Sequence, residues 1–311
     1  MKPLLLSPCY VKTIWGSNRI SQIRHMNEKI GSWWEVSAHS NAQSTVINLE
    51  DKPTLLEVIQ ENPDDILGPG YTLHEMLRTA FLDTDDHLSI QVHPDDAYAL
   101  KHSNDFGKYE SWYIVYAEKD AYLVAGTKTN QKEIIQNALK EENLEPYLKK
   151  WKVKAGDYIT IPNGTLHALG KGILAYEIGT NSDTTYRFYD YNRTDDKGNK
   201  RELHLKESFD VCDFSSQPIF VPAQNISHNL SSTPYFQVDE LYTEKEETIS
   251  CKEHYCILTN LFKEDLSFQW NGQTMILDGY GSLFVPYSAQ EIKIPSGCHV
   301  LLSIPKKGKK Q

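Results

Sequence analysis

The sequence predicts a mainly β protein made of two β-barrels with short helical insertions. Short apolar segments with strand-like alternation recur along the 311 residues and are separated by Gly, Pro and Asn. Helical spacing is confined to a few short stretches, which argues against strands and helices alternating around a parallel sheet. Residues 279–286 resemble the earlier run that leads into Pro162, and this weak internal echo favours a second barrel.

Three segments of the N-terminal part carry the most informative strands. In residues 89–93 the alternation places Gln91 and His93 on one face of a strand. Glu110 opens a second strand-like run over residues 111–116. In residues 156–167 a short apolar strand enters an Asn-Gly turn, and we expect a hairpin whose second strand carries His167.

Three short helices are expected between these strands. Asn130 resembles an N-cap for a helix over residues 131–140, in which the apolar positions follow helical spacing. Residues 52–60 and 94–102 are the other candidates. In the latter, Pro94 suits the first helical position, and the two aspartates that follow suit the positive end of a helix.

The echo also predicts how the chain divides. Polar turn residues cluster at 231–234, so we expect a catalytic domain over residues 1–235 and a smaller barrel over residues 236–311. Aligning the two prolines of the echo places Glu291 opposite His167, and no pair of metal-binding side chains precedes it. The second barrel is therefore expected to pack against the first and to hold no metal.

The composition indicates which classes of partner and which cellular compartment to expect. The net charge of −10 argues against nucleic acid and anionic membranes as partners. The sequence holds no apolar run of transmembrane length and no signal-peptide core. Its five cysteines are scattered without a Cys-x-x-Cys motif, which is typical of reduced thiols. We therefore expect a cytoplasmic protein.

Four side chains on these strands form a candidate metal-ligand set. His93 and His167 supply imidazoles, Glu110 supplies a carboxylate, and Gln91 supplies an amide. A nitrogen and oxygen set without thiolate suits Zn²⁺, Fe²⁺ or Mn²⁺. The amide is a weak ligand, so direct ligation by Gln91 and contact through water both remain open.

The spacing of these residues resembles a known family. The pattern Gly-x5-Pro-x-Gly-x2-His, from Gly156 to His167, matches the second motif of the cupin (jelly-roll) barrels. Gln91-x-His93-Pro, followed at a distance by Lys108-x-Glu110, resembles the type I mannose-6-phosphate isomerases, and the chain length fits their short bacterial branch. Long-branch members carry a histidine where this chain has Gly107. Three further segments share the resemblance: Trp15-Gly16, residues 34–39 and residues 182–191.

The resemblance implies a zinc-dependent aldose-ketose isomerase that interconverts mannose 6-phosphate and fructose 6-phosphate through an enediol, with one Zn²⁺ per chain. It assigns catalytic and substrate-binding roles to Lys108 and Arg187, and a substrate-binding wall to Trp15. The base could be Lys108, a metal-bound water or another carboxylate. The expected partner is a small-molecule sugar phosphate, and the expected assembly is a monomer or a weak homodimer.

Two other functions use the same residues. Two histidines and one carboxylate also form the facial triad of non-haem Fe(II) enzymes, so a cupin dioxygenase is the alternative enzyme. A sugar-phosphate-binding cupin without catalytic activity is the alternative from a different class. Retention of Lys108 and Arg187 beside the ligand set favours the isomerase.

Overall fold

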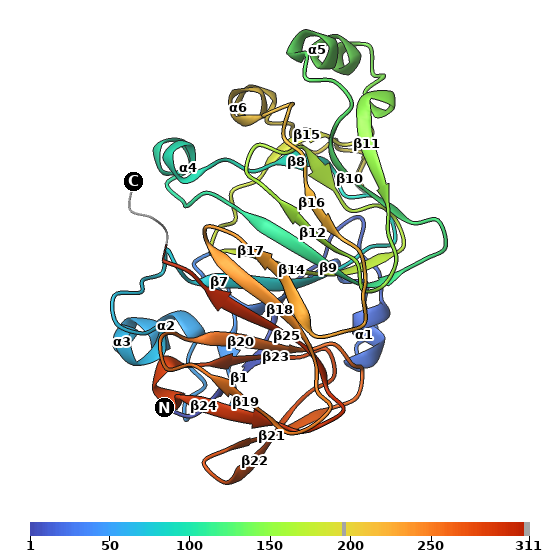
Figure 1. Cartoon of the computed structure of the whole chain (residues 1–311). Helices are drawn as coiled ribbons and strands as arrows, with labels where there is room; N and C mark the ends of the chain where they lie inside the picture. The colour runs from blue at the N-terminus through green and yellow to red at the C-terminus, as the bar shows by residue number, and fades with distance from the viewer. Residues whose placement is uncertain (195–196, 308–311) are drawn as a thin grey trace.

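Antiparallel sheets stacked in layers form the body of the protein (Figure 1). In this computed structural model residues 1–194 and 197–307 are described, and every element named below lies within them. Among the described residues strands outnumber helices, and no helix has more than nine residues. The mainly β prediction is therefore confirmed.

The first pair of sheets carries the predicted ligand strands. A seven-stranded sheet runs, in spatial order, β16 (Ile219–Val221), β12 (Tyr158–Ile161), β9 (Glu110–Ala117), β14 (Ile173–Thr180), β7 (Leu77–Asp83), β3 (Ser32–Val36) and β2 (Cys9–Val11). Facing it is a five-stranded sheet of β11 (Leu148–Lys152), β10 (Tyr122–Thr127), β13 (His167–Ala168), β8 (Ile90–Val92) and β15 (Tyr186–Tyr189).

The second pair of sheets is built mainly from the C-terminal part of the chain. Its seven-stranded sheet runs β17 (His228–Ser232), β18 (Phe236–Tyr242), β25 (His299–Pro305), β20 (Cys256–Asn260), β23 (Ser282–Val285), β1 (Leu4–Ser7) and β6 (Thr45–Val46). A four-stranded sheet of β19 (Glu247–Ser250), β24 (Glu291–Ile294), β21 (Leu266–Trp270) and β22 (Gln273–Leu277) accompanies it, and β4 (Ala38–His39) pairs separately with β5 (Ala42–Gln43).

Three large apolar clusters fill the spaces between these layers. One holds Trp112 together with Leu123 and so joins the sheets of the first pair. A second holds Tyr176 and Phe284, from the two seven-stranded sheets. The third holds residues of the second pair alone, such as Leu283. Neighbours such as Leu283 and Phe284 enter different clusters because successive side chains of a strand point to opposite faces.

The helices lie at the edges of the sheets, and three of them match the predicted ones. The helical elements are α1 (Arg19–Ile23), α2 (Leu55–Glu61), α3 (Pro63–Ile66), α4 (Asp96–His102), α5 (Lys132–Lys140), α6 (Leu205–Val211) and the short turns Glu145–Tyr147 and Tyr287–Ala289.

Each predicted helix begins later than its sequence pattern indicated, and side-chain caps fix the starts of α2 and α4. Thr54 and Glu57 form a reciprocal capping box that starts α2. Asp95 accepts a hydrogen bond from the Tyr98 amide at 2.9 Å, so Asp95, and not a residue before Pro94, is the N-cap of α4. The N-cap of α5 is Gln131, so the assignment of Asn130 was wrong.

The expected hairpin around the Asn163-Gly164 turn is also wrong. Strand β12 pairs with β9 and β16, whereas β13 pairs with β10 and β8. The turn therefore carries the chain from one sheet of the first pair to the other. Gly164 adopts a φ of +79°, a region that favours glycine, and an added Cβ would lie 2.9 Å from the Val211 carbonyl oxygen.

The two ends of the chain meet in one sheet. Strand β1 pairs with β23 through Leu4 and Phe284, and on its other side it pairs with β6. Residues before position 50 thus complete a sheet whose other strands all follow residue 227. The division near residue 235, and the closure of the sheets as two separate barrels, stay predictions.

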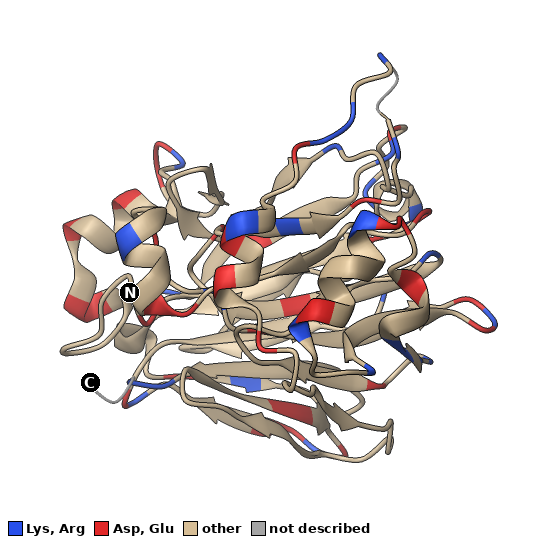
Figure 2. Ribbon diagram, turned by 90° about the horizontal axis from the view of Figure 1, so that it is seen from above, with Lys and Arg blue, Asp and Glu red and all other residues tan. Residues whose placement is uncertain are grey.

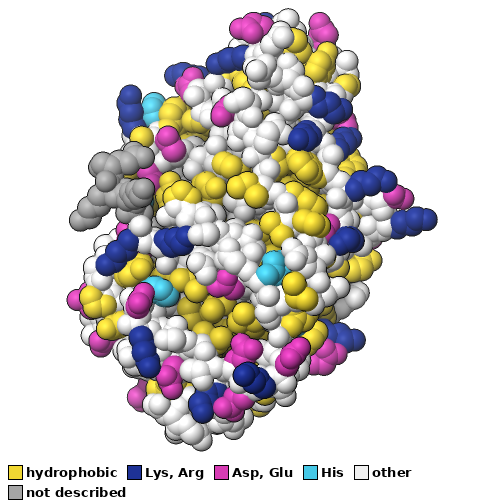
Figure 3. Space-filling view, in the orientation of Figure 1, with side chains coloured by type: hydrophobic (Ala, Val, Ile, Leu, Met, Phe, Trp, Pro, Cys, Tyr) yellow, Lys and Arg dark blue, Asp and Glu magenta, His cyan; other side chains and the backbone are white. Residues whose placement is uncertain are grey.

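The surface mixes charges of both signs. Acidic and basic residues are interspersed over helices and loops in Figure 2 and on the face seen in Figure 3. Among the described residues, no helix combines the length and the apolar character that a membrane crossing requires.

The position of β1 leads to a stability prediction. Leu4 is fully buried in the cluster between the two seven-stranded sheets, so Leu4→Ala should lower the free energy of unfolding by about 2–5 kcal/mol. Ile276→Ala is the control, because Ile276 is 56% exposed and its loss should change stability by less than about 0.5 kcal/mol. Urea denaturation measures both. Equal denaturation midpoints for Leu4→Ala and the unchanged protein would show that β1 does not contribute to the core.

Candidate metal centre

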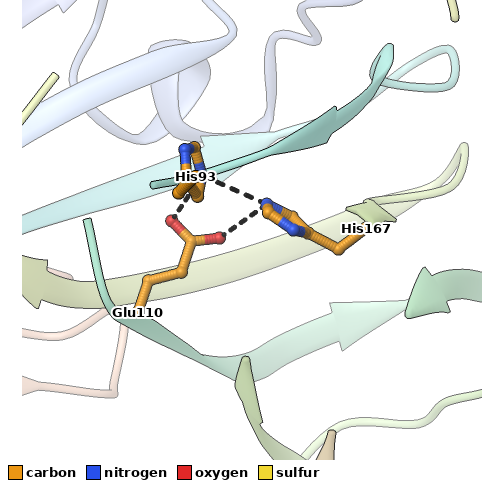
Figure 4. A group of neighbouring side chains, drawn as sticks. All are labelled: His93, Glu110 and His167. Atoms are coloured by element: carbon orange, nitrogen blue, oxygen red, sulfur yellow. Dashed lines mark hydrogen bonds and ion pairs between the residues drawn. The ribbon is translucent and has the colours of Figure 1, made fainter. Parts of the chain in front are cut away.

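Both sheets of the first pair contribute to a cluster of three buried side chains, His93, Glu110 and His167 (Figure 4). Glu110 opens β9, His167 opens β13 and His93 follows β8. The two Nε2 atoms lie 3.1 Å apart. The carboxylate oxygens of Glu110 lie 3.2 Å from Nε2 of His167 and 3.5 Å from Nε2 of His93. The structure therefore brings together three of the four predicted ligands.

Backbone carbonyls orient both imidazoles. Nδ1–H of His93 donates to the Thr184 carbonyl at 2.9 Å, and Nδ1–H of His167 donates to the Thr165 carbonyl at 2.8 Å. With Nδ1 protonated in each ring, both Nε2 lone pairs face the centre. Burial, followed by the nearby Lys108, lowers the pKa of His93 to about 3, so this ring is neutral at pH 7.

Glu110 is fully buried and closes the third side of the cluster. Neither carboxylate oxygen has a hydrogen-bond partner of good geometry among the described residues. Burial alone would raise the pKa of Glu110, but the Lys108 ammonium outweighs it and holds this pKa well below its usual range. Nζ of Lys108 lies 2.7 Å from Oε2 of Glu110.

Gln91 and Arg187 lie in register with His167 on three neighbouring strands. His167 pairs with Gln91, and Gln91 pairs with Arg187. The Gln91 amide nitrogen is 3.4 Å from Nε2 of His167, so Gln91 adjoins the cluster. The Arg187 guanidinium donates to the Glu202 carbonyl at 2.8 Å and keeps a buried Nε–H without a partner in the described structure.

Trp15 lies in the apolar cluster between the same two sheets. It is 8% exposed, and its ring would lie 2.6 Å from a Cβ added at Gly31. Its carbonyl accepts a hydrogen bond from the Asp85 amide at 2.8 Å. These contacts place Trp15 in the packing of the sheet, and its substrate-binding role stays a prediction.

The sequence analysis missed two charged residues beside the cluster. Glu177 on β14 lies 3.2 Å from Nζ of Lys108, and Arg78 on β7 lies 2.7 Å from Glu177. Each is a charged residue inside a mainly apolar, buried strand. A charge in such a strand must be buried with a partner, and this is the signal that could have identified both.

A third residue that the sequence did not single out, Asp105, organises the loop of residues 182–184. This loop holds the Thr184 carbonyl that fixes the His93 ring. Burial alone would raise the pKa of Asp105, but hydrogen bonds from His39 and from this loop hold it far below its usual range. The loop donors are Ser182 Oγ at 3.2 Å, the Asp183 amide at 3.0 Å and Thr184 Oγ1 at 2.9 Å.

The residues of the cluster fit a divalent cation. Two imidazole lone pairs face each other at 3.1 Å, and a desolvated carboxylate stands beside them. Each of these groups offers electron density to the same point, and an ion at that point would satisfy all of them. Two nitrogens, one carboxylate and no thiolate suit zinc and also suit iron.

Comparison with known sequences places the chain in a family. A model of the catalytic domain of type I phosphomannose isomerase matches residues 4–112. The mannose-6-phosphate isomerase of Streptococcus mutans is 38% identical over 245 residues, which cover 76% of this chain and 78% of that protein. Mannose-6-phosphate isomerase ManA of Bacillus subtilis is 40% identical over 220 residues, which cover 70% of each chain.

Solved structures show the same likeness. The crystal structure of mannose 6-phosphate isomerase from Bacillus subtilis superposes with a TM-score of 0.85 at 28% identity and covers 97% of this chain and 99% of that one. A mannose 6-phosphate isomerase bound with zinc and yttrium superposes with a TM-score of 0.72, covering 99% and 100% of the two chains, and at 13% identity it shows a shared fold alone. The chain therefore belongs to the type I mannose-6-phosphate isomerase family.

Proposed function

We propose that this protein is a zinc-dependent isomerase that interconverts mannose 6-phosphate and fructose 6-phosphate through an enediol. One observation carries the proposal: in a member of this family, two Nε2 lone pairs and a buried carboxylate converge beside the Lys108 ammonium. The test is a coupled assay for fructose 6-phosphate formed from mannose 6-phosphate, with and without a chelator. Oxygen consumption instead of isomerisation would favour an Fe(II) dioxygenase, and substrate binding without turnover would favour a sensor.

The proposed cofactor is one Zn²⁺ per chain, held by His93, Glu110 and His167, with Gln91 adjoining. When bound, zinc would act as a Lewis acid on the substrate oxygens without changing its own oxidation state. This chemistry suits an isomerisation, which moves a proton between two carbons and transfers no net electrons.

Lys108 and Arg187 are the proposed catalytic and substrate-binding side chains. The proton that moves between C1 and C2 needs a base, and Nζ of Lys108, 2.7 Å from Glu110, stands close enough to the cluster to accept it in its neutral amine form. Arg187 lies in register with Gln91 and carries a permanent charge, so it can stabilise the enediolate without exchanging protons. Trp15 is the proposed wall of the substrate site.

We infer a cytoplasmic enzyme whose partner is a small sugar phosphate. The net charge of −10 disfavours nucleic acid and anionic membranes as partners. A monomer or weak homodimer is proposed, and light scattering after size-exclusion chromatography, repeated over a range of protein concentrations, tests it.

Removal of one imidazole should remove the metal. His167→Ala should lose both the zinc and the isomerase activity while the protein stays folded, because the apolar clusters between the sheets remain. Metal analysis and circular dichroism measure the two effects. His254→Ala is the control, since His254 lies outside the ligand set and contacts the Tyr255 carbonyl and the Tyr71 ring. Full zinc occupancy in His167→Ala would exclude His167 as a ligand.

Charge and proton transfer can be separated at the two cations. Arg187→Ala should lower kcat roughly a hundredfold or more, with a smaller effect on KM, if its interaction strengthens in the transition state. Lys108→Arg keeps the positive charge but removes an exchangeable amine, so it should not restore activity and should change the acid limb of the pH–rate profile. A near-normal kcat in Lys108→Arg would assign the base elsewhere.

The loop that fixes His93 gives a pH-dependent prediction. The pKa of Asp105 is depressed in the folded protein, so its stabilising effect is present above the unfolded pKa of about 4 and is lost as pH falls through the folded value. Asp105→Asn should therefore lower stability by about 1.5–3 kcal/mol at pH 7, and the difference should shrink below about pH 4. Zinc affinity should fall as well. A difference in stability that does not vary with pH would contradict this role of the carboxylate.

A further inference from the structure

Arg78 is a buried cation on the face of the sheet that carries Glu110. It is 3% exposed and pairs across β7 and β14 with Gly179, which in turn pairs across β14 and β9 with Glu110. Paired residues of neighbouring strands share a face of the sheet. Gly179 lies between Arg78 and Glu110 on this row and has no side chain.

The Arg78 guanidinium has three partners. One terminal nitrogen lies 2.7 Å from Oε1 of Glu177, and the other lies 3.4 Å from Oδ1 of Asp183. Its carbon lies 4.1 Å from the centre of a Trp34 ring, a cation–π distance. The planar fork and the stacked ring leave Arg78 little freedom to move.

Glu177 connects Arg78 to the proposed catalytic lysine. The Oε1 atom that accepts from Arg78 also lies 3.2 Å from Nζ of Lys108, and the same Nζ lies 2.7 Å from Glu110. Charges of alternating sign thus follow one another from Arg78 through Glu177 and Lys108 to Glu110. Each member of this buried row is held by its neighbours, because an unpaired buried charge is strongly unfavourable.

We propose that Arg78 is a positioning residue for the isomerase: it holds the Glu177 carboxylate in the orientation that keeps Nζ of Lys108 beside Glu110. Arg78 acts through Glu177 and does not itself contact the three clustered ligands. Because it also pairs with Asp183, it connects this row to the loop of residues 182–184. The proposal rests on the isomerase function proposed above.

The protein provides a matched control on the opposite face of β3. Arg24 and Glu35 form a buried ion pair at 2.7 Å, in which Glu35 is 3% exposed. The guanidinium lies 4.8 Å from the centre of a Trp33 ring, just as Arg78 stacks on Trp34. This pair has the same chemistry as the Arg78 pair, but it faces the C-terminal sheet and the cluster of Glu110 lies on the other side.

The test compares the zinc-loaded variants Arg78→Gln, Arg78→Lys and Arg24→Gln by steady-state kinetics, zinc content and thermal unfolding. Arg78→Gln should lower kcat about 10- to 100-fold with KM changed less than about threefold, the range found for residues that orient an active site from outside it. Zinc content should stay near that of the unchanged protein. Arg78→Lys should recover part of the loss, because it restores the charge but not the fork. Arg24→Gln should lose comparable thermal stability and keep its kcat.

A double-mutant cycle adds a second measure. If Arg78 acts through Glu177, the kcat of the double variant Arg78→Gln/Glu177→Gln should be no lower than that of the less active single variant. Additive losses would overturn the proposal. So would a normal kcat in Arg78→Gln, or an equal kcat loss in Arg24→Gln, which would indicate a general effect of burying an unpaired carboxylate.

The crystal structure of Arg78→Gln separates this proposal from the function itself. Nζ of Lys108 should move away from Glu110 in that variant, and an unmoved lysine would overturn the positioning role whatever reaction the protein catalyses. Absence of isomerase activity in the unchanged zinc-loaded protein would instead reject the proposed function. In that case the position of Lys108 in the crystal structure of Arg78→Gln would still test whether Arg78 positions this lysine.

Discussion

The burial of Glu110 is the constraint on which the rest of the centre depends. A carboxylate withdrawn from water at the start of β9 requires positive charge around it, since the cost of desolvation otherwise favours the neutral form. Lys108 supplies one such charge, and the Nε2 atoms of His93 and His167, which face each other beside the carboxylate, leave room for a second from a metal ion. The lysine, the ring tautomers and the paired charges beyond them all follow from keeping this carboxylate ionised.

Local charge at the centre differs from that of the whole chain. The four charges of the buried row balance, with Arg78 and Lys108 against Glu110 and Glu177. A divalent cation would therefore make this region positive in a protein whose net charge is −10. Such a local excess favours an anionic ligand such as a sugar phosphate without requiring a basic surface, and Figure 2 shows charges of both signs interspersed over the chain.

Alternation along β3 lets one strand serve two layers. Trp33 and Trp34 point to opposite faces, and each ring packs against an arginine that pairs with a buried glutamate. The pair on one face stabilises packing against the C-terminal sheet, and the pair on the other face lies beside the candidate metal centre. The same sheet therefore supports both the core of the protein and the geometry of the site, which explains how buried charges are tolerated on both of its sides.

The sequence by itself determined the β class and pointed to the cluster of His93, Glu110 and His167 with Gln91 beside it, because strand alternation and motif spacing are local properties. The resemblance to a family added Lys108 and Arg187 as candidates. Only the tertiary structure decided that the Asn163-Gly164 turn crosses between sheets and that β1 completes a C-terminal sheet, since pairing partners far apart in sequence leave no local pattern. It also decided the tautomers of the two rings, through carbonyls that the fold supplies. The tertiary structure also decided the partners of Arg78 and Glu177. A charged residue in an apolar strand indicates that it needs a partner, but it does not indicate which residue the folded sheets place beside it.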